Sequence, residues 1–245
     1  MSVIVMGDQA VGKTTLMLEL AKSNRGDIQV IKPSYDYLGR FTLNDQVMPT
    51  DSISSITMQL SVNLSGNIKE IKVDWIDSPG EAWRAEDSRW RKANPQDWNF
   101  LSTSLHNAKF LMIVMAPYRE LLNENLVGND GLSIEDIRFR KQTQWKNRFQ
   151  EWIYFLEKNA RNNQYVIFCL NMADLFCDVQ QISDALQREK SINWMQHKIN
   201  VLPIFDNVRE LIYRFEKNRI VKTQVFITTY KARRLLELPW LYMGT

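Results

Sequence analysis

The sequence contains few of the residues that build metal centres, disulfides and catalytic triads. Its 245 residues include two histidines, His106 and His197, and two cysteines, Cys169 and Cys177. The cysteines lie in or beside an apolar run without the paired spacing of a metal site, so we expect two reduced thiols. The histidines are far apart in sequence. Little material is therefore present for a histidine-based metal site or for a triad.

Strong charge of one sign and long apolar runs are also missing. Lysine and arginine number 31 against 28 acidic residues, a net charge of +3, which is too weak to indicate nucleic acid or an anionic membrane as a partner. No apolar run approaches the roughly 20 residues that cross a bilayer. The first six residues are apolar but lead straight into glycine and charge, unlike a signal peptide. We therefore expect a cytoplasmic protein without a membrane span or an evident nucleic-acid partner.

Short apolar runs alternate with longer helical or mixed stretches along the chain. This pattern is typical of an α/β fold with a mainly parallel sheet, because parallel strands need long crossover connections. The expected strands are Ser2–Met6, Thr57–Leu64, Ile71–Ile76, Phe110–Ala116, Tyr165–Leu170 and Gln224–Thr228. Ser65-Gly66-Asn67 is a turn-type sequence between the second and third of these strands, and it predicts an antiparallel hairpin.

Apolar residues at helical spacing predict three helices, Lys13–Ser23, about Ile134–Asn162 and about Asn207–Asn218. No repeat, low-complexity tract or linker divides the chain. We therefore expect a single domain over residues 1–245 with insertions near 81–107 and 118–136. After Thr228 the helical stretch Lys231–Leu238 soon meets Pro239, which predicts either a short closing helix or a chain that is part of a longer protein.

The strongest motif lies between the first expected strand and the first expected helix. Gly7-Asp8-Gln9-Ala10-Val11-Gly12-Lys13-Thr14 fits the P-loop pattern G-x-x-x-x-G-K-[ST] at every fixed position. The two glycines let successive N–H groups point at phosphate oxygens, and the start of the helix adds further N–H groups and partial positive charge. The lysine supplies charge to the β- and γ-phosphates, and the threonine hydroxyl ligates magnesium. The predicted nucleotide-binding residues here are Gly7, Asp8, Gln9, Ala10, Val11, Gly12, Lys13, Thr14 and Thr15.

A second element supplies an acid for the magnesium shell. Asp77-Ser78-Pro79-Gly80 follows the expected strand Ile71–Ile76, so Asp77 falls at the carboxyl edge of that strand. The N–H of Gly80 can bond the γ-phosphate and move away after hydrolysis. The pattern predicts Asp77 as a metal-binding residue and Gly80 as a sensor of the γ-phosphate.

The order of these motifs resembles that of the Ras-like, TRAFAC-class P-loop GTPases, and most closely a divergent bacterial branch of larger domains. The matching elements are Gly7–Thr14, Asp77–Gly80, Asn171-Met172-Ala173-Asp174 and Thr228-Thr229-Tyr230-Lys231, which span nearly the whole chain. The resemblance implies a three-layer α/β fold whose mainly parallel, six-stranded sheet has one antiparallel strand. It also implies GTP and GDP as ligands, Mg²⁺ as cofactor, and two switch segments that contact a protein effector or activator.

The base-reading element departs from the family pattern Asn-Lys-x-Asp, because Met172 stands where the family has lysine. Met172 keeps the apolar packing of that side chain but not its charge. Asn171 and Asp174 remain, and the Asp174 carboxylate can accept hydrogen bonds from N1–H and the exocyclic amine of guanine, donors that adenine lacks at that edge. A simple turn after a buried strand is the alternative interpretation. Thr228 and Thr229 match loosely the segment that meets the guanine oxygen, and they complete the nucleotide-binding set.

The resemblance also assigns the first switch and the attacking water. Thr50 is the candidate ligand of magnesium and the γ-phosphate, with Thr57 in reserve. Glu81 directly follows Gly80, where the family has a glutamine that orients the water; a carboxylate can hold the water, act as a base or repel the γ-phosphate. The predicted catalytic set is Lys13, Gly80 and Glu81, and the predicted metal set is Thr14, Thr50 and Asp77.

Tryptophan and basic residues crowd the stretch after Gly80, in Trp83, Arg84, Arg89, Trp90, Arg91, Lys92 and Trp98. Tryptophan and arginine are favoured at binding hot spots, so the stretch is a candidate partner surface. The alternative is a helix whose tryptophans enter the core and whose charges face water.

Three functions fit these patterns. The first is a guanine-nucleotide-binding switch that hydrolyses GTP slowly, because no internal arginine finger is evident in the sequence. Glu81 and Met172 motivate the second, a nucleotide-binding scaffold without hydrolysis. The third is a nucleotide-dependent phosphotransferase, which needs an acceptor pocket and several arginines on a mobile segment; residues 83–92 are the candidate for that segment.

Overall fold

A seven-stranded β-sheet forms the middle layer of the computed structural model, which describes residues 2–22, 26–39, 42–43, 46–47, 54–64, 66–77, 80–83, 89–189, 191–219 and 221–245. The strand order is β2-β5-β6-β1-β7-β8-β9. These strands are β1 (Ser2–Gly7), β2 (Ile28–Lys32), β5 (Ser54–Leu64), β6 (Asn67–Asp77), β7 (Phe110–Met115), β8 (Tyr165–Leu170) and β9 (Lys222–Ile227). A separate two-stranded ribbon pairs β3 (Thr42–Leu43) with β4 (Gln46–Val47).

The sheet confirms the predicted class and corrects the strand count. β5 runs antiparallel to both of its neighbours, β2 and β6, and the pairs β6–β1, β1–β7, β7–β8 and β8–β9 are all parallel. One antiparallel strand in a mainly parallel sheet is therefore right, but the sheet has seven strands rather than six. The missed strand, β2, lies at the edge and buries only Ile28 fully, so it lacks the apolar run that marks a central strand.

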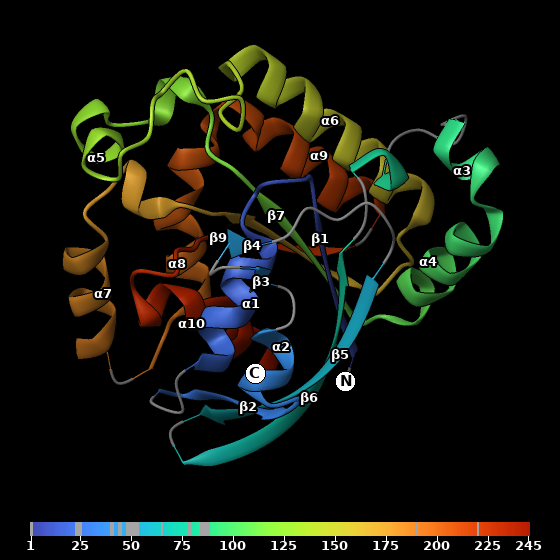
Figure 1. Cartoon of the computed structure of the whole chain (residues 1–245), viewed down its shortest axis with the longest axis horizontal. Helices are drawn as coiled ribbons and strands as arrows, with labels where there is room; N and C mark the ends of the chain where they lie inside the picture. Colours follow the sequence, from blue (N-terminus) through green and yellow to red (C-terminus); the bar gives the residue numbers. More distant parts are fainter. Residues whose placement is uncertain are drawn as a thin grey trace.

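Helices cover both faces of the sheet (Figure 1). Helices α4, α6 and α9 pack together on one face, and α1 and α10 pack on the other. The helices are α1 (Lys13–Lys22), α2 (Tyr35–Leu38), α3 (Arg89–Ala93), α4 (Pro95–Asn107), α5 (Glu124–Asn129), α6 (Gln142–Asn159), α7 (Val179–Arg188), α8 (Trp194–Val201), α9 (Arg209–Arg219) and α10 (Arg233–Gly244). Short 3₁₀ turns occur at η2 (Gly80–Trp83), η3 (Arg119–Leu121), η4 (Ala173–Leu175) and η5 (Leu202–Val208).

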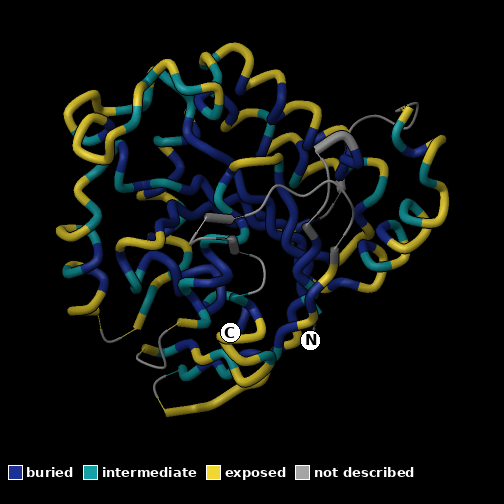
Figure 2. The backbone as a smooth tube through the Cα atoms, in the orientation of Figure 1, coloured by how far each residue is buried: buried dark blue, intermediate teal, exposed yellow. Residues whose placement is uncertain are grey.

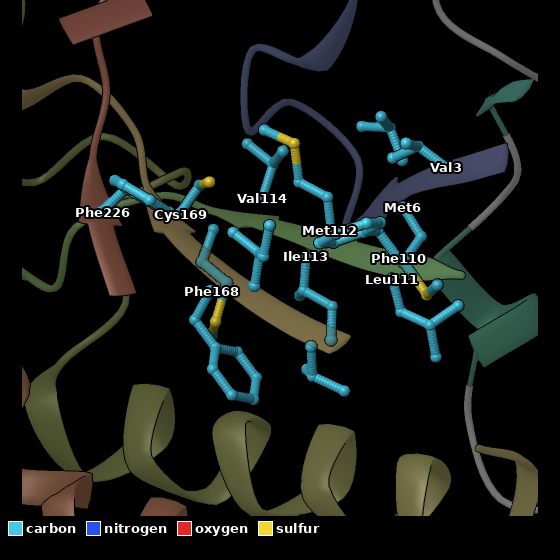
Figure 3. Packing of buried hydrophobic residues seen from close by; sticks show 14 of the residues in the cluster. Val3, Met6, Phe110, Leu111, Met112, Ile113, Val114, Phe168, Cys169 and Phe226 are labelled. Carbon is cyan, nitrogen blue, oxygen red and sulfur yellow. The ribbon is translucent and has the colours of Figure 1, made fainter. Parts of the chain in front are cut away.

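The core lies between the sheet and these two helical layers, where Figure 2 shows the buried backbone. Every residue of β7 is buried, which accounts for its uninterrupted apolar sequence. Its side chains alternate: in Figure 3 Ile113 points toward the helices below the sheet, and Val114 points the opposite way. Phe168 of β8 points to the same side as Ile113, and its ring centroid is 4.8 Å from that of Phe149 on α6. Alternation along the central strands thus supplies both halves of the core.

Helix α6 is shorter than the predicted Ile134–Asn162. The main-chain N–H and guanidinium of Arg138 bond the carboxylate of Asp136, which favours a turn over a helix at this point. Ile137 is 95% exposed and so lies off the buried stripe that the sequence pattern assigned to it. The helix begins at Gln142, where the regular apolar spacing from Trp145 onward sets in.

Helix α10 runs through Pro239 instead of stopping before it. Proline inside a helix costs roughly 3 kcal/mol because it removes a hydrogen bond and crowds the preceding turn. Here the helix buries most of its residues, including Trp240, whose ring stacks on Trp75 of β6 at 6.0 Å between centroids. Burial of this surface offsets the local preference of proline.

Helix α10 also ties down the far end of α1. Arg233 donates to the main-chain oxygens of Glu19 and Leu20 in the last turn of α1, at 2.9 and 3.1 Å. Its Nε bonds Glu237 at 2.7 Å, and Glu237 accepts the main-chain N–H of Ile28 at 3.3 Å. Burial raises the pKa of Glu237 above its usual value, although Arg233 acts in the opposite direction. The pair of the partly buried Arg233 and the buried Glu237 fixes α1 and the start of β2 to one helix.

The sequence of the tryptophan-rich stretch allowed either a partner surface or a segment packed into the core. Trp83 is fully buried and packs on Trp152 and Phe155 of α6, with ring centroids 6.0 and 5.6 Å away. Arg91 is buried as well, and its guanidinium lies 3.7 Å from the centroid of the Trp98 ring. The interpretation as a core segment therefore holds for Trp83, while Arg84 lies outside the described residues.

None of the helices in the described part of the chain combines the length and the apolar character that a membrane-spanning segment needs.

We predict that acid destabilises the fold through His197. This residue is buried on α8 between the rings of Trp194 and Phe226, and burial lowers its pKa to about 4. Because the folded-state pKa lies below the unfolded value near 6.5, the stability that the neutral ring contributes is complete above that value and is lost as the pH falls toward 4. Between pH 7 and pH 5 the loss is about 2 kcal/mol.

Urea titrations at these two pH values measure the effect. His197→Phe keeps an aromatic ring but removes the titrating group, so its free energy of unfolding falls less with acid than that of the wild type. His106→Gln, a substitution at an exposed histidine on α4, serves as the control and keeps the wild-type slope. Equal slopes for all three proteins would contradict the assignment to His197.

Candidate nucleotide-binding site

The P-loop sits at the carboxyl end of the central strand β1, where ligands bind in open parallel sheets. β1 lies between β6 and β7, and Gly7 pairs with Val114 of β7. A Cβ on Gly7 would lie 2.3 Å from the main-chain oxygen of Val114, so a side chain is excluded there. The first glycine of the motif is therefore required by the close approach of β7.

Two residues of the loop adopt left-handed backbone conformations. Gly12 has φ +84°, and a Cβ at that position would lie 2.6 Å from Nδ2 of Asn171. Ala10 has φ 60°, a conformation that non-glycine residues adopt sparsely. Such conformations turn peptide N–H groups toward the inside of a loop, and they gather at functional sites.

Lys13 begins helix α1, and its ammonium group lies inside the loop. The side chain is buried, and Nζ donates to the main-chain oxygens of Gly7 at 3.1 Å and Asp8 at 2.8 Å. Thr14 and Thr15 follow in the first turn of α1 and are half-buried. The N–H groups of a first helical turn have no acceptor within their own helix. The ammonium group of Lys13 is thus held within the loop that precedes the start of α1.

An ion pair between the buried Arg148 and the partly buried Asp8 fixes the loop to α6. The guanidinium of Arg148 bonds both carboxylate oxygens of Asp8 from Nε, at 3.0 and 2.9 Å. It also bonds Glu151 at 2.6 Å, and its side chain is 5% exposed. Burial alone lowers the pKa of Arg148, but the hydrogen bonds and charges of Asp8 and Glu151 raise it above its usual value. The main-chain oxygen of Asp8 therefore bonds Lys13 within the loop, whereas its carboxylate bonds Arg148 of α6.

The sequence contains a signal for this pair that the motif analysis missed. Arg148 lies three residues after Trp145 and four before Trp152, both of which are buried. It is therefore on the apolar stripe of α6, and a charge on a buried stripe requires a partner of opposite charge.

Asn171 connects the P-loop to the carboxyl ends of β8 and β9. Its side chain is buried; Nδ2 donates to the main-chain oxygen of Val11 at 2.9 Å, and Oδ1 accepts the hydroxyl of Thr228 at 3.2 Å. The structure thus brings together three of the predicted segments. Asn171 acts in the described geometry by bracing the loop with its side chain.

Asp174 lies beside this junction. One of its carboxylate oxygens accepts the hydroxyl of Thr229, and the other lies 3.1 Å from Nζ of Lys231. Lys231 also forms an ion pair with Asp130, beyond the C-terminal end of α5. Although burial lowers the pKa of Lys231, the bonds to Asp130 and Asp174 raise it overall. The candidate base-reading carboxylate is therefore held in place from two sides.

Met172 contacts two separate sets of neighbours. Its backbone is left-handed, with φ 59°, and its Cε lies 3.7 Å from the position of a Cβ on Gly12. It also packs on a second hydrophobic cluster, formed by Val127, Phe139 and Leu175 with Leu122, Leu132 and Ile134. Most of that cluster comes from the segment that follows β7. An apolar side chain at this position joins that segment to the P-loop.

The predicted metal and switch residues are placed less completely. Trp75 of β6 pairs with Val5 of β1, so Asp77, two residues later, ends its strand at the level of Gly7. This backbone position and the Thr14 hydroxyl at the start of α1 fit the hard oxygen ligands that Mg²⁺ prefers. Gly80 and Glu81 begin the turn η2. The side chains of Asp77 and Glu81, like all of Thr50, lie outside the described residues.

Thr57, the reserve candidate, is placed away from this site: its hydroxyl donates to Asp74 across the β5–β6 hairpin at 2.8 Å. Within the described residues, no group of three or more His, Cys, Asp or Glu side chains is arranged to hold a metal ion.

A cavity of about 320 Å³ opens beside the P-loop, on the side that faces α6. Its walls include the loop residues Asp8 to Val11 and the end of β7. Three arginines contribute to the remaining wall, Arg138, Arg140 and Arg148. The predicted arginine-bearing stretch was residues 83–92, so this cluster is a further finding of the structure.

The chain has no match among family models or curated proteins but does resemble solved structures. Among solved structures, the chain is similar to one described as a crystal structure of a probable GTP-binding protein engB, with 12% sequence identity over 100% of this chain and 97% of that chain. The TM-score is 0.42, so the assignment of the fold rests on the strand order and directions described above.

Proposed function

We propose that this chain is a guanine-nucleotide-binding switch that holds GTP or GDP with Mg²⁺ and hydrolyses GTP slowly. The observation that carries the proposal is the buried junction at Asn171, which joins the P-loop to the two strand ends that bear Asp174 and Thr229. The proposed site for phosphates and the proposed site for a base edge are thereby connected through the side chain of Asn171. Both sites lie at carboxyl ends of parallel strands, the first after β1 and the second after β8 and β9, with β7 between them, and this arrangement fits the two ends of a nucleotide.

The phosphate end works by positioning charge. Lys13 exchanges its bonds to the oxygens of Gly7 and Asp8 for the β- and γ-phosphates, and the start of α1 adds its N–H groups and positive dipole end. Thr14 and Asp77 are the residues that would hold Mg²⁺ directly or through water. The ion would neutralise charge that builds up on the phosphates during hydrolysis.

The base end selects guanine over adenine. The carboxylate of Asp174 presents two acceptor oxygens, and guanine offers two donors at N1 and the exocyclic amine. Thr229 orients one of these oxygens through its hydroxyl. A pocket that pairs with polar groups of its ligand rejects an analogue without them by roughly 10⁴-fold or more.

The switch and the partner follow from the γ-phosphate. Gly80 and Thr50 are the residues proposed to sense it, and a change of nucleotide state then alters the surface presented to a protein effector or activator. Glu81, next to Gly80, is proposed to hold the attacking water. Slow turnover is expected because intrinsic rates of GTP hydrolysis without a helper protein can be as low as about 10⁻⁴ to 10⁻² per second.

We predict that nucleotide binding depends on Lys13 and Thr14. Lys13→Ala removes the charge at the phosphates, and Thr14→Ala removes a magnesium ligand, so both weaken GDP binding in the presence of Mg²⁺ by at least 100-fold. Isothermal titration measures the affinity, and circular dichroism verifies that the variants are folded. Lys22→Ala, at the exposed end of the same helix, is the matched control and binds normally. Undiminished affinity in Lys13→Ala would refute the phosphate site.

A second prediction concerns the base. Asp174→Asn replaces an acceptor by an amide donor, so the variant loses affinity for GTP and gains affinity for xanthosine triphosphate, whose base carries an oxygen in place of the amine. Competition against a fluorescent GDP analogue measures both changes. Asp130→Asn is the control, because it alters the same lysine neighbour without changing the base edge. A wild-type preference for ATP would exclude guanine selection by Asp174.

A third prediction separates a hydrolysing switch from a scaffold. Glu81→Ala changes the single-turnover rate of GTP hydrolysis at least tenfold, equivalent to about 1.4 kcal/mol of barrier. Phosphate release from the preloaded protein is the measurement, and Glu189→Ala, an exposed substitution after α7, is the control. No release from the wild-type protein over hours would favour the scaffold, and release only with an added acceptor would favour a phosphotransferase.

A further inference from the structure

The segment of residues 118–141, here called the strap, spans the candidate site from one end to the other. At the base end, Asp130 forms its ion pair with Lys231. At the phosphate end, a guanidinium nitrogen of Arg140 lies 3.5 Å from the carboxylate of Asp8. In Figure 1 the strap includes α5 and leads into the start of α6. Both ends of the nucleotide would therefore lie next to this one segment.

The strap is held in place by apolar packing and by a main-chain hydrogen bond between its two ends. Its apolar residues Val127 and Phe139 form the second hydrophobic cluster with Leu175. The main-chain N–H of Arg119 donates to the oxygen of Arg140 at 2.9 Å, which closes the strap into a loop. These contacts fix the backbone from which Arg140 projects.

The three arginines of the cavity differ in how firmly they are bound. Arg138 bonds Asp136 in its own turn, and this contact lowers the pKa of Asp136 to about 2. Arg148 is buried between Asp8 and Glu151. The exposed fractions of the side chains are 5% for Arg148, 30% for Arg138 and 40% for Arg140. Arg140 thus combines a cavity position with the most exposed side chain of the three.

Arg140 can leave Asp8 at low cost. Its contact there is long and half-exposed, and such ion pairs are typically worth at most about 1 kcal/mol. Asp8 keeps its three hydrogen bonds from Arg148 after Arg140 has moved. The main-chain oxygen of the same Asp8 lies 2.8 Å from the ammonium of Lys13. Asp8 therefore contacts both the guanidinium of Arg140, through its carboxylate, and the ammonium of Lys13, through its main-chain oxygen.

We propose that Arg140 is an arginine supplied by the chain itself to the terminal phosphate of a bound nucleoside triphosphate; the inference rests on the nucleotide-binding function proposed above. Arg140 moves from Asp8 into contact with the γ-phosphate oxygens and stabilises the charge that spreads over them during transfer. The oxygen of water bonds to the γ-phosphorus as the bond to the bridging oxygen breaks. The bridging electron pair stays on GDP, the protons of water pass to phosphate and solvent, and Arg140 keeps its own.

The test uses the full chain with Mg²⁺, GDP and aluminium fluoride, which mimics the transferring phosphoryl group. Titration calorimetry gives the affinity for GDP with and without fluoride complex. The wild type binds GDP at least tenfold more tightly with aluminium fluoride, without any other protein. Arg140→Ala loses this gain but binds GDP alone within twofold of the wild type, and its single-turnover hydrolysis is at least 100-fold slower.

Two further variants sharpen the result. Arg140→Lys keeps one positive charge but not the forked geometry, so it restores part of the gain in affinity and part of the rate. Arg209→Ala, at a 46% exposed arginine on α9 that pairs with Asp206, behaves as the wild type. This pattern separates a contact with the phosphoryl group from a general effect of surface charge.

The outcomes distinguish this inference from the function on which it rests. A wild type that binds no GDP removes the nucleotide site itself. A wild type that binds GDP but gains nothing from aluminium fluoride overturns the role of Arg140. The role is equally overturned if Arg140→Ala keeps the gain, or if it weakens GDP alone as much as GDP with fluoride, since the residue then only shapes the loop.

Discussion

The buried ion pair between Asp8 and Arg148 is the constraint on which the arrangement of the site depends. A guanidinium removed from water costs several kcal/mol unless its charge and hydrogen bonds are met, and here Asp8 and Glu151 meet them. The pair joins the second residue of the P-loop to the middle of α6. Phe149 of α6 packs on Phe168 of β8. The position of the loop is therefore fixed by the core as well as by the strand that precedes it. Removing one partner of such a pair destabilises by about 3–5 kcal/mol.

The same logic extends from the loop to the strap. Met172 contacts the region of Gly12 on one side and the second hydrophobic cluster on the other. A lysine at this position would place its charged end among Val127, Leu175 and their neighbours, where it would lose hydration. The apolar side chain of Met172 thus fits the contacts between the P-loop and the strap. The strap in turn brings Asp130 to Lys231 and Arg140 to Asp8.

The parts of this structure that could be predicted from sequence are those with a local signature. The runs Phe110–Met115 and Tyr165–Leu170 are continuously apolar because both faces of their strands are covered, and the P-loop carries fixed residues at fixed spacing. The hairpin of β5 and β6 followed from its turn. The antiparallel strand followed from the resemblance, whereas the edge strand β2 lacks a buried run and was missed.

The other missed features depend on contacts between distant residues. Asp8 and Arg148 are separated by 140 positions, and Asp130 and Lys231 by 101. The position of Arg148 on the buried stripe of α6 indicates that it needs an acidic partner. The pattern does not indicate that this partner is Asp8. The strap gave a helical pattern at Ile134–Lys141 that the Asp136–Arg138 turn overrides. Trp83 is a similar case. Its sequence context is compatible with a surface position and with a core position, and only its packing on Trp152 shows that it belongs to the core.

The link between Arg233 and the last turn of α1 has a consequence for how the amount of folded protein responds to its ligand. A positive group at the C-terminal end of a helix complements the negative end of its dipole, and Arg233 is placed there by α10. A phosphate bound as proposed supplies the complementary negative charge at the other end. Helix, ligand and α10 then share one energetic unit, so binding stabilises the folded state as a whole, by about 2.7 kcal/mol at a ligand concentration 100 times the dissociation constant. Where nucleotide binds as proposed, its concentration therefore also sets the fraction of the chain that is folded.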